Sequence, residues 1–135
     1  TGGLIAHKLT EVPGCSAVLG LAVTGYSNEA KNQVLGVPQS SLERYGAVSR
    51  ETALAMAGGA LALSKADVAV STTGFAGPVG GKHAAQPVGL VFVGLAWHGG
   101  TISARLRILG TRSEIKERAS KKALDLLRRH VLRNR

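Results

Sequence analysis

The sequence is short of cysteine, of acidic residues and of long apolar runs, and each shortage excludes a class of protein. Cys15 is the only cysteine, so the chain forms no internal disulfide, and we expect a cytoplasmic location. No apolar run reaches the roughly 18 residues of a membrane-spanning helix, so we expect no association with a membrane. The four histidines are scattered, and no spacing of Cys, His and carboxylate residues is typical of a metal site.

A chain of 135 residues is long enough for one hydrophobic core, so we expect a single domain over residues 1–135. Its net charge of +9 is concentrated at the C-terminal end, because residues 112–135 hold nine Lys and Arg against three acidic residues. A basic helix there can bind nucleic acid, but no aromatic side chains are interleaved with the charges to stack on bases. We therefore favour a solvated helix face and do not expect nucleic acid as a partner.

The first half of the chain predicts several helices and one strand. Apolar spacing predicts a helix over Leu4–Leu9, and Thr1-Gly2-Gly3 before it would present backbone N–H groups to an anion. Val18–Thr24 is mostly apolar and predicts a strand. The remaining helices are expected from Ser27 or Asn28 through Val34, over Ser40–Arg44, and from Ser49 through Leu63.

A strand followed by a glycine-rich loop lies at the centre of the chain. Val68, Ala69 and Val70 predict a strand buried on both faces, and Ser71–Thr73 place hydroxyl groups where that strand should end. The loop from Gly74 to Gly81 is rich in glycine, which lets a backbone approach a ligand closely and present its N–H groups. Ligands of open α/β sheets bind at such strand ends, but a flexible connection without a ligand is an equal alternative.

Two strands and a long helix are expected in the last third of the chain. Val88–Trp97 and Thr101–Leu109 predict a β-hairpin, because a short glycine-rich link joins them. Thr111 and Glu114 form a capping box that begins the last helix. Its apolar stripe is expected to consist of Ile115, Ala119, Ala123, Leu126, Leu127 and Val131. This order of elements is typical of a mixed α/β domain with at least one antiparallel strand pair.

Lys31 is a candidate catalytic residue. It follows an expected strand and the turn Tyr26-Ser27-Asn28, where burial would lower its pKa. A lysine desolvated in this way can act as the general base for a hydroxyl nucleophile, as in enzymes that pair a serine with a lysine. A solvated helix lysine is the commoner alternative.

Thr73 and Arg112 are further candidates at the ends of elements. Thr73 can relay a proton or orient an amide, or it can simply end a strand. Arg112 begins the last helix and can bind phosphate, or it can balance the charge of Glu114 or Glu117. The sequence contains neither a P-loop nor a Gly-x-Gly-x-x-Gly motif, so the usual phosphate-binding loops are excluded.

Several short blocks occur in the order seen in one family. They are Thr1-Gly2-Gly3, Tyr26-Ser27-Asn28-Glu29-Ala30-Lys31, Gly46-Ala47-Val48-Ser49, Thr73-Gly74-Phe75-Ala76-Gly77-Pro78, Pro87-Val88-Gly89 and Gly110-Thr111-Arg112. Over essentially its whole length the chain resembles the C-terminal domain of the CinA (competence/damage-inducible) family, the nicotinamide mononucleotide (NMN) amidohydrolases. The Tyr-Ser-Asn-x-x-Lys and Thr-Gly-x-Ala-Gly-Pro blocks are jointly specific for that family.

The resemblance implies a three-layer α/β/α sandwich with a mixed β-sheet, whose first strand would lie upstream of Thr1. It also implies hydrolysis of the carboxamide of NMN to nicotinic acid mononucleotide and ammonia, with neither a metal nor another cofactor. The nucleophilic serine of the family stands two places before its Thr-Gly-Gly block. In this protein that serine would therefore also lie upstream of Thr1.

The resemblance assigns roles residue by residue. Lys31 matches the general base, Tyr26 belongs to the active-site turn, and Thr73 is the hydroxyl residue at the end of the central strand. The residues expected to bind NMN come from the same blocks: Thr1, Gly2, Asn28, Gly74, Ala76, Gly77 and Arg112. Two alternatives stay open, a non-catalytic member that binds a nucleotide or nucleic acid through its pocket and basic C-terminal helix, and an assembly module. We expect a homodimer.

Overall fold

The computed structural model of the protein describes residues 1–81 and 86–134, which form five α-helices, a short 3-10 helix and three β-strands. In chain order they are α1 (Leu4–Thr10), η1 (Cys15–Ala17), α2 (Asn28–Leu35), α3 (Gln39–Tyr45), α4 (Arg50–Ser64), β1 (Val68–Gly74), β2 (Leu90–Trp97), β3 (Gly100–Arg107) and α5 (Arg112–Arg133). The expected α/β class is confirmed, as are the five helices. None of these helices is both long and apolar enough to cross a membrane.

The strands form one sheet in the order β1-β2-β3, and both neighbouring pairs run antiparallel. β2 and β3 are the predicted hairpin, and β1 lies on the other side of β2 with Val70 opposite Leu95. Because no two of the described strands run parallel, they do not form the mixed sheet that the resemblance implied.

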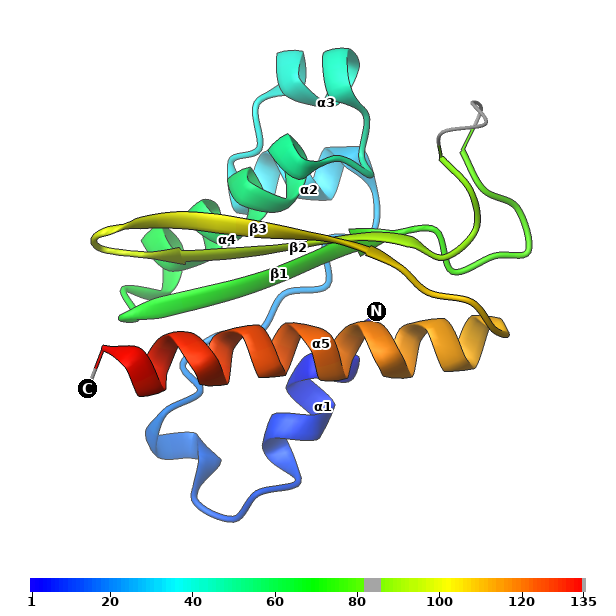
Figure 1. Ribbon diagram of the computed structural model, residues 1–135. Helices are drawn as coiled ribbons and strands as arrows, with labels where there is room; N and C mark the ends of the chain where they lie inside the picture. Colours follow the sequence, from blue (N-terminus) through cyan, green and yellow to red (C-terminus); the bar gives the residue numbers. More distant parts are fainter. Residues whose placement is uncertain (82–85, 135) are drawn as a thin grey trace.

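Helices cover both faces of this sheet (Figure 1). α4 packs across β2 and β1 on one face, with α2 and α3 beyond it, and α5 lies along the other face with α1 beside it. Gly94 of β2 permits the close approach of α4, because a Cβ there would lie 2.3 Å from the carbonyl oxygen of Ala53. The two apolar clusters are Leu35, Val37, Leu42 and Met56 among α2, α3 and α4, and Val91, Ile108, Ile115 and Ala119 beneath α5.

The helix starts follow the predicted capping residues. Ser27 Oγ accepts a hydrogen bond from the Ala30 N–H group at 3.0 Å and so begins α2. Thr111 and Glu114 make both hydrogen bonds of the predicted capping box at the start of α5. The apolar stripe of α5 is buried near its start but not at its end, where Val131 is 44% exposed. The end of α5 still contacts the sheet, because the His130 ring lies 4.3 Å from the ring of Trp97, the last residue of β2.

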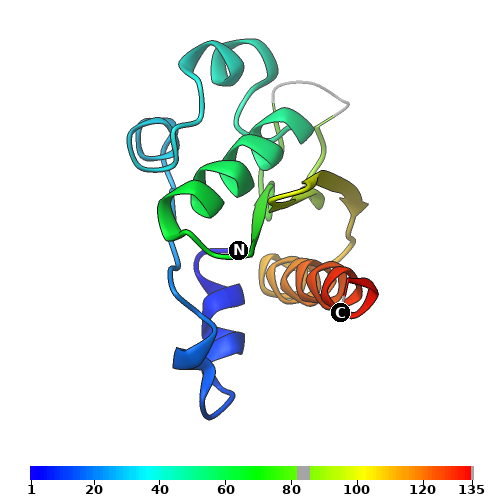
Figure 2. The same ribbon diagram turned by 90° about the vertical axis from the view of Figure 1, so that its left-hand side faces the viewer.

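The predicted strand over Val18–Thr24 is wrong, because residues 19–26 have no regular secondary structure. A strand requires a hydrogen-bonded neighbour, and none of the backbone N–H groups of residues 20–26 donates to a described backbone carbonyl. Val18 and Leu21 are 84% and 39% exposed. Figure 2 shows that the chain starts between this irregular segment and β1.

β1 is an edge strand within the described residues. The Phe75 N–H group donates to the Leu90 carbonyl at 2.9 Å, and this bond fixes the alternation along β1. Ala69, Ser71 and Thr73 therefore turn their backbone groups toward β2, whereas Val68, Val70 and Thr72 turn theirs away. The apolar run 68–70 is half-buried as a result, and not buried on both faces as expected. The hydroxyl residues 71–73 lie within β1 and not at its end, since the strand continues to Gly74.

Candidate active site

A cavity of about 1330 Å³ lies between β1, the irregular segment 19–26 and the start of α5. All but one of the predicted site residues line it: Thr1, Gly2, Tyr26, Lys31, Thr73, Gly74, Ala76, Gly77 and Arg112. The exception is Asn28, which is exposed at the first position of α2. The cavity exceeds the roughly 300–1,000 Å³ that is usual for a small-molecule site, so it has room for more than a nucleotide.

Lys31 is the most buried cation of the cavity, with a relative exposure of 6%. Its Nζ atom donates to the carbonyl oxygens of Gly25 at 2.8 Å and Tyr26 at 3.2 Å. Burial lowers the pKa of Lys31 from its ordinary value of 10.5, because desolvation disfavours the ammonium form. A neutral amine whose two N–H groups point at these carbonyls keeps its lone pair for an incoming proton. Lys31 thus has the geometry and the pKa direction of a general base.

Arg112 connects the two loops that border the cavity. Its Nη1 atom donates to the Gly77 carbonyl at 2.5 Å, and its Nη2 atom donates to the Tyr26 hydroxyl at 3.2 Å. Among the described residues no carboxylate pairs with Arg112, so it does not balance Glu114 or Glu117. The guanidinium holds the glycine-rich loop against the Tyr26 turn.

The hydroxyl groups of Ser71 and Thr73 in β1 hydrogen-bond to backbone carbonyls outside the sheet. Thr73 Oγ1 donates to the Ala47 carbonyl at 2.6 Å, and Ser71 Oγ donates to the Ala53 carbonyl at 2.6 Å. Both bonds fasten β1 to the segment that contains α4. The hydroxyl of Thr73 therefore positions the strand, and it can receive a proton only by accepting a further hydrogen bond.

The start of the glycine-rich loop presents unused backbone donors. Phe75 is anchored to β2, since it donates to Leu90 and its carbonyl accepts from Gly89 at 2.7 Å. The N–H groups of Gly74, Ala76 and Gly77 donate to no described residue. Such groups are the usual donors of an oxyanion hole, provided that they face the developing charge.

Lys116 also lines the cavity, although the sequence analysis did not select it. It lies one helical turn after Arg112, and its Nζ atom would be 3.6 Å from a Cβ at Gly2. The spacing of four residues from Arg112 was the available indication, because residues i and i+4 share one face of a helix.

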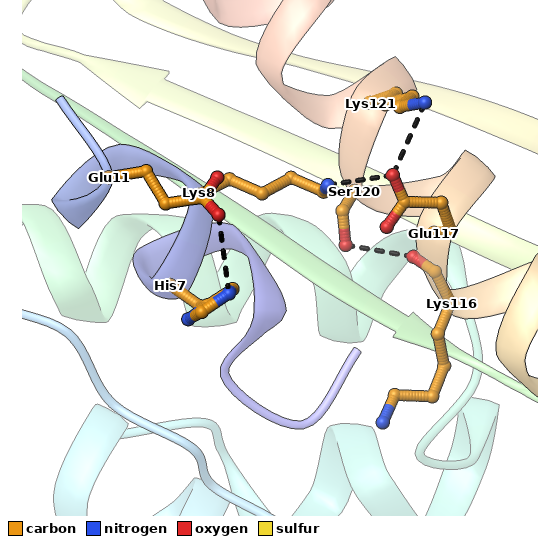
Figure 3. Close-up of polar contacts among 7 residues, drawn as sticks. All are labelled: His7, Lys8, Glu11, Lys116, Glu117, Ser120 and Lys121. Carbon is orange, nitrogen blue, oxygen red and sulfur yellow. Dashed lines mark hydrogen bonds and ion pairs between the residues drawn. The ribbon is translucent and has the colours of Figure 1, made fainter.

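The neighbours of Lys116 on the surface are paired with each other (Figure 3). The Oε1 atom of Glu117 accepts hydrogen bonds from Lys8 Nζ at 2.7 Å and from Lys121 Nζ at 3.2 Å. These hydrogen bonds lower the pKa of the Glu117 carboxyl group. The side chain of Lys116 points away from this group, and only its backbone carbonyl takes part, by accepting from Ser120 at 2.8 Å. The Glu117 cluster joins α1 to α5 and leaves Lys116 to the cavity.

Fold and site together define an α/β domain with a lysine-centred, positively charged cavity at the edge of its sheet. Within residues 1–81 and 86–134, no three His, Cys, Asp or Glu residues are grouped so that they could hold a metal ion. The model of the CinA C-terminal domain matches residues 1–131, so the chain belongs to this family.

Individual relatives agree with this assignment. A curated protein of Thermoanaerobacter pseudethanolicus, described as competence-damage inducible, is 51% identical over 132 residues, which are 98% of this chain and 32% of that protein. The crystal structure of competence/damage inducible protein CihA from Agrobacterium tumefaciens is 45% identical, with a TM-score of 0.89 over 93% of this chain and 77% of that one. A CinA superfamily protein from Escherichia coli is 33% identical, with a TM-score of 0.90 over 93% and 73%. The chain thus spans about a third of the length of such curated relatives.

Proposed function

We propose that the protein is a nicotinamide-nucleotide amidohydrolase, which hydrolyses NMN to nicotinic acid mononucleotide and ammonia. The observation that carries the proposal is Lys31, a buried lysine with a lowered pKa in a cavity that also holds unused backbone donors. Membership of the CinA C-terminal domain family supports it, since the blocks that carry the resemblance supply these residues.

In the proposed reaction a serine placed just before Thr1 attacks the carboxamide carbon, and Lys31 Nζ accepts the proton of its hydroxyl. The N–H groups of Gly74, Ala76 and Gly77 stabilise the oxyanion of the tetrahedral intermediate. Lys31 returns the proton to the nitrogen, ammonia leaves, and an acyl-enzyme ester remains. Lys31 then removes a proton from the water that attacks the ester. It returns this proton to the serine oxygen as the C–O bond breaks, so that nicotinic acid mononucleotide leaves and the serine is restored.

Thr1 lies beside β1 in the lining of the cavity, so a serine just before it in the chain would lie close to the cavity as well. The Thr1 hydroxyl lies 3.1 Å from that of Thr72 in β1, and a Cβ at Gly3 would lie 3.3 Å from Thr24 Oγ1 in the irregular segment. A preceding segment that ran along the free edge of β1 toward Thr1 would be parallel to β1. It could pair with both neighbours, fill the excess volume of the cavity and complete a mixed sheet within three layers.

The test is ammonia release from NMN by the natural polypeptide, in a form that extends upstream of Thr1 to include the expected serine. Lys31→Met is expected to reduce kcat at least about 100-fold, as removal of a general base usually does. Lys122→Met is the matched control, because Lys122 is exposed on α5 and lines no part of the cavity. Circular dichroism establishes that both variants are folded.

Two results would count against the proposal. A folded natural protein without any NMN hydrolysis would favour the non-catalytic binding module instead. Unchanged turnover in Lys31→Met would remove Lys31 from the reaction. The homodimer stays a prediction, which size-exclusion chromatography of the same samples can test.

A further inference from the structure

Two neighbouring cations of α5 face the cavity without an acidic partner. Four other basic residues of this region share two carboxylates: Lys8 and Lys121 pair with Glu117, and Arg128 and Arg129 pair with Asp125. Among the described residues, neither Arg112 nor Lys116 has a carboxylate within ion-pair distance. Their charges are therefore available to a ligand.

The cavity as a whole carries an excess of positive charge. Lys31, Arg112 and Lys116 line it, and Asp67 is the only acidic residue among its described lining residues. Asp67 precedes β1, whereas Arg112 contacts Gly77 beyond the other end of that strand. The positive end of the cavity therefore lies near the start of α5, and it suits an anionic group.

Arg112 and Lys116 differ in how much of their hydrogen-bonding capacity is in use. Arg112 already donates to the Gly77 carbonyl and to the Tyr26 hydroxyl, which fixes its guanidinium in place. The Lys116 ammonium donates to no described residue, although it reaches the cavity beside Gly2. A lysine ammonium is a flexible point charge with three donors, which suits a phosphate that arrives in more than one orientation.

We propose that Lys116 binds the phosphate monoester of the substrate and makes the protein select phosphorylated over unphosphorylated nucleosides. Arg112 assists by adding charge and by holding the glycine-rich loop. The identity of the substrate in this inference rests on the proposed function, but the binding of a phosphate monoester does not.

The first experiment compares two amide substrates on the natural polypeptide, NMN and nicotinamide riboside, which lacks the phosphate. Lys116→Ala is expected to lower the ratio of kcat/KM for NMN to that for nicotinamide riboside at least about tenfold, as befits one lost charge-assisted hydrogen bond. Lys116→Arg should restore most of the ratio. Lys121→Ala is the matched control, a lysine of the same helix whose partner is Glu117, and it should leave the ratio unchanged.

A second experiment measures equilibrium binding of ribose 5-phosphate by calorimetry and needs no turnover. Its affinity should fall about tenfold in Lys116→Ala and stay constant in Lys121→Ala. Equal affinity in both variants, or an unchanged substrate ratio, would overturn the inference. If NMN is not hydrolysed but the affinity for ribose 5-phosphate still depends on Lys116, the amidase proposal fails and the phosphate site stands.

Discussion

Adjacent glycines in α4 provide a matched pair of substitutions with opposite expected effects on stability. A Cβ at Gly59 would lie 1.7 Å from the carbonyl oxygen of Leu35, the last residue of α2, whereas a Cβ at Gly58 would meet nothing within 4 Å. Ala is favoured over Gly in a helix interior by about 1 kcal/mol, and both variants gain this amount. Gly59→Ala must in addition separate two backbones, and overpacking of a core usually costs about 1–3 kcal/mol or more.

We therefore expect Gly58→Ala to raise the free energy of unfolding by about 1 kcal/mol and Gly59→Ala to lower it by about 2 kcal/mol. For a chain of 135 residues, the resulting gap of about 3 kcal/mol corresponds to roughly 10 °C in melting temperature. Urea unfolding followed by circular dichroism measures this difference in the free energy of unfolding between the two variants. Equal dependences of that free energy on urea concentration would show that the unfolded states are alike. Equal midpoints for the two variants would refute the claim that the α2–α4 contact depends on Gly59.

Three further predictions concern the site and the sheet edges. The rate of NMN hydrolysis should rise with pH and level off below pH 10.5, because burial lowers the pKa of Lys31 and the neutral amine is the active form; a rate that falls from neutral to alkaline pH would contradict this. Thr73→Val should lower the free energy of unfolding by about 1–3 kcal/mol and Thr73→Ser should restore most of it, since the bond to Ala47 needs only a hydroxyl; equal denaturation midpoints would contradict this. In the natural polypeptide, hydrogen exchange should be slow at the outward amides of β1 and fast at those of β3, because a strand joined to Thr1 would cover only the former. The amides compared are Val68, Val70 and Thr72 against Thr101, Ser103 and Arg105, and equally fast exchange would argue against that strand.

The sequence predicted the helices well because their signals are local. Ser27, Thr111 and Glu114 lie within a few residues of the N–H groups that they cap, so the pattern and the structure depend on the same short segment. The segment 18–24 shows the opposite case. Its apolar composition favours a strand, but a strand exists only beside a partner, and the described residues supply none.

The position of the candidate residues along one cavity was predictable to a similar extent. Lys31 could be selected from the sequence because the residues that it contacts are close in the chain. The carbonyl groups of Gly25 and Tyr26, which accept its hydrogen bonds, lie six and five residues before it. Thr73 lines the cavity and its catalytic role stays a prediction, but sequence could not reveal that its hydroxyl donates to the carbonyl of Ala47, which is 26 residues distant in the chain. The sequence analysis missed Lys116 because no local pattern separates it from the other lysines of α5. Only the structure shows that Lys121 pairs with Glu117 while the Lys116 side chain points away from that pair.

The two edges of the sheet differ in their tendency to aggregate. The edge formed by β3 carries Arg105 and Arg107, whose charges repel a second copy of the same strand and so protect against edge-to-edge assembly. β1 has no such charge, and among the described residues nothing pairs with the outward backbone groups of Val68, Val70 and Thr72, which lie next to an exposed apolar segment. Comparing the solubility of a 135-residue polypeptide with that of one extended upstream of Thr1 would therefore test whether a preceding segment covers the β1 edge.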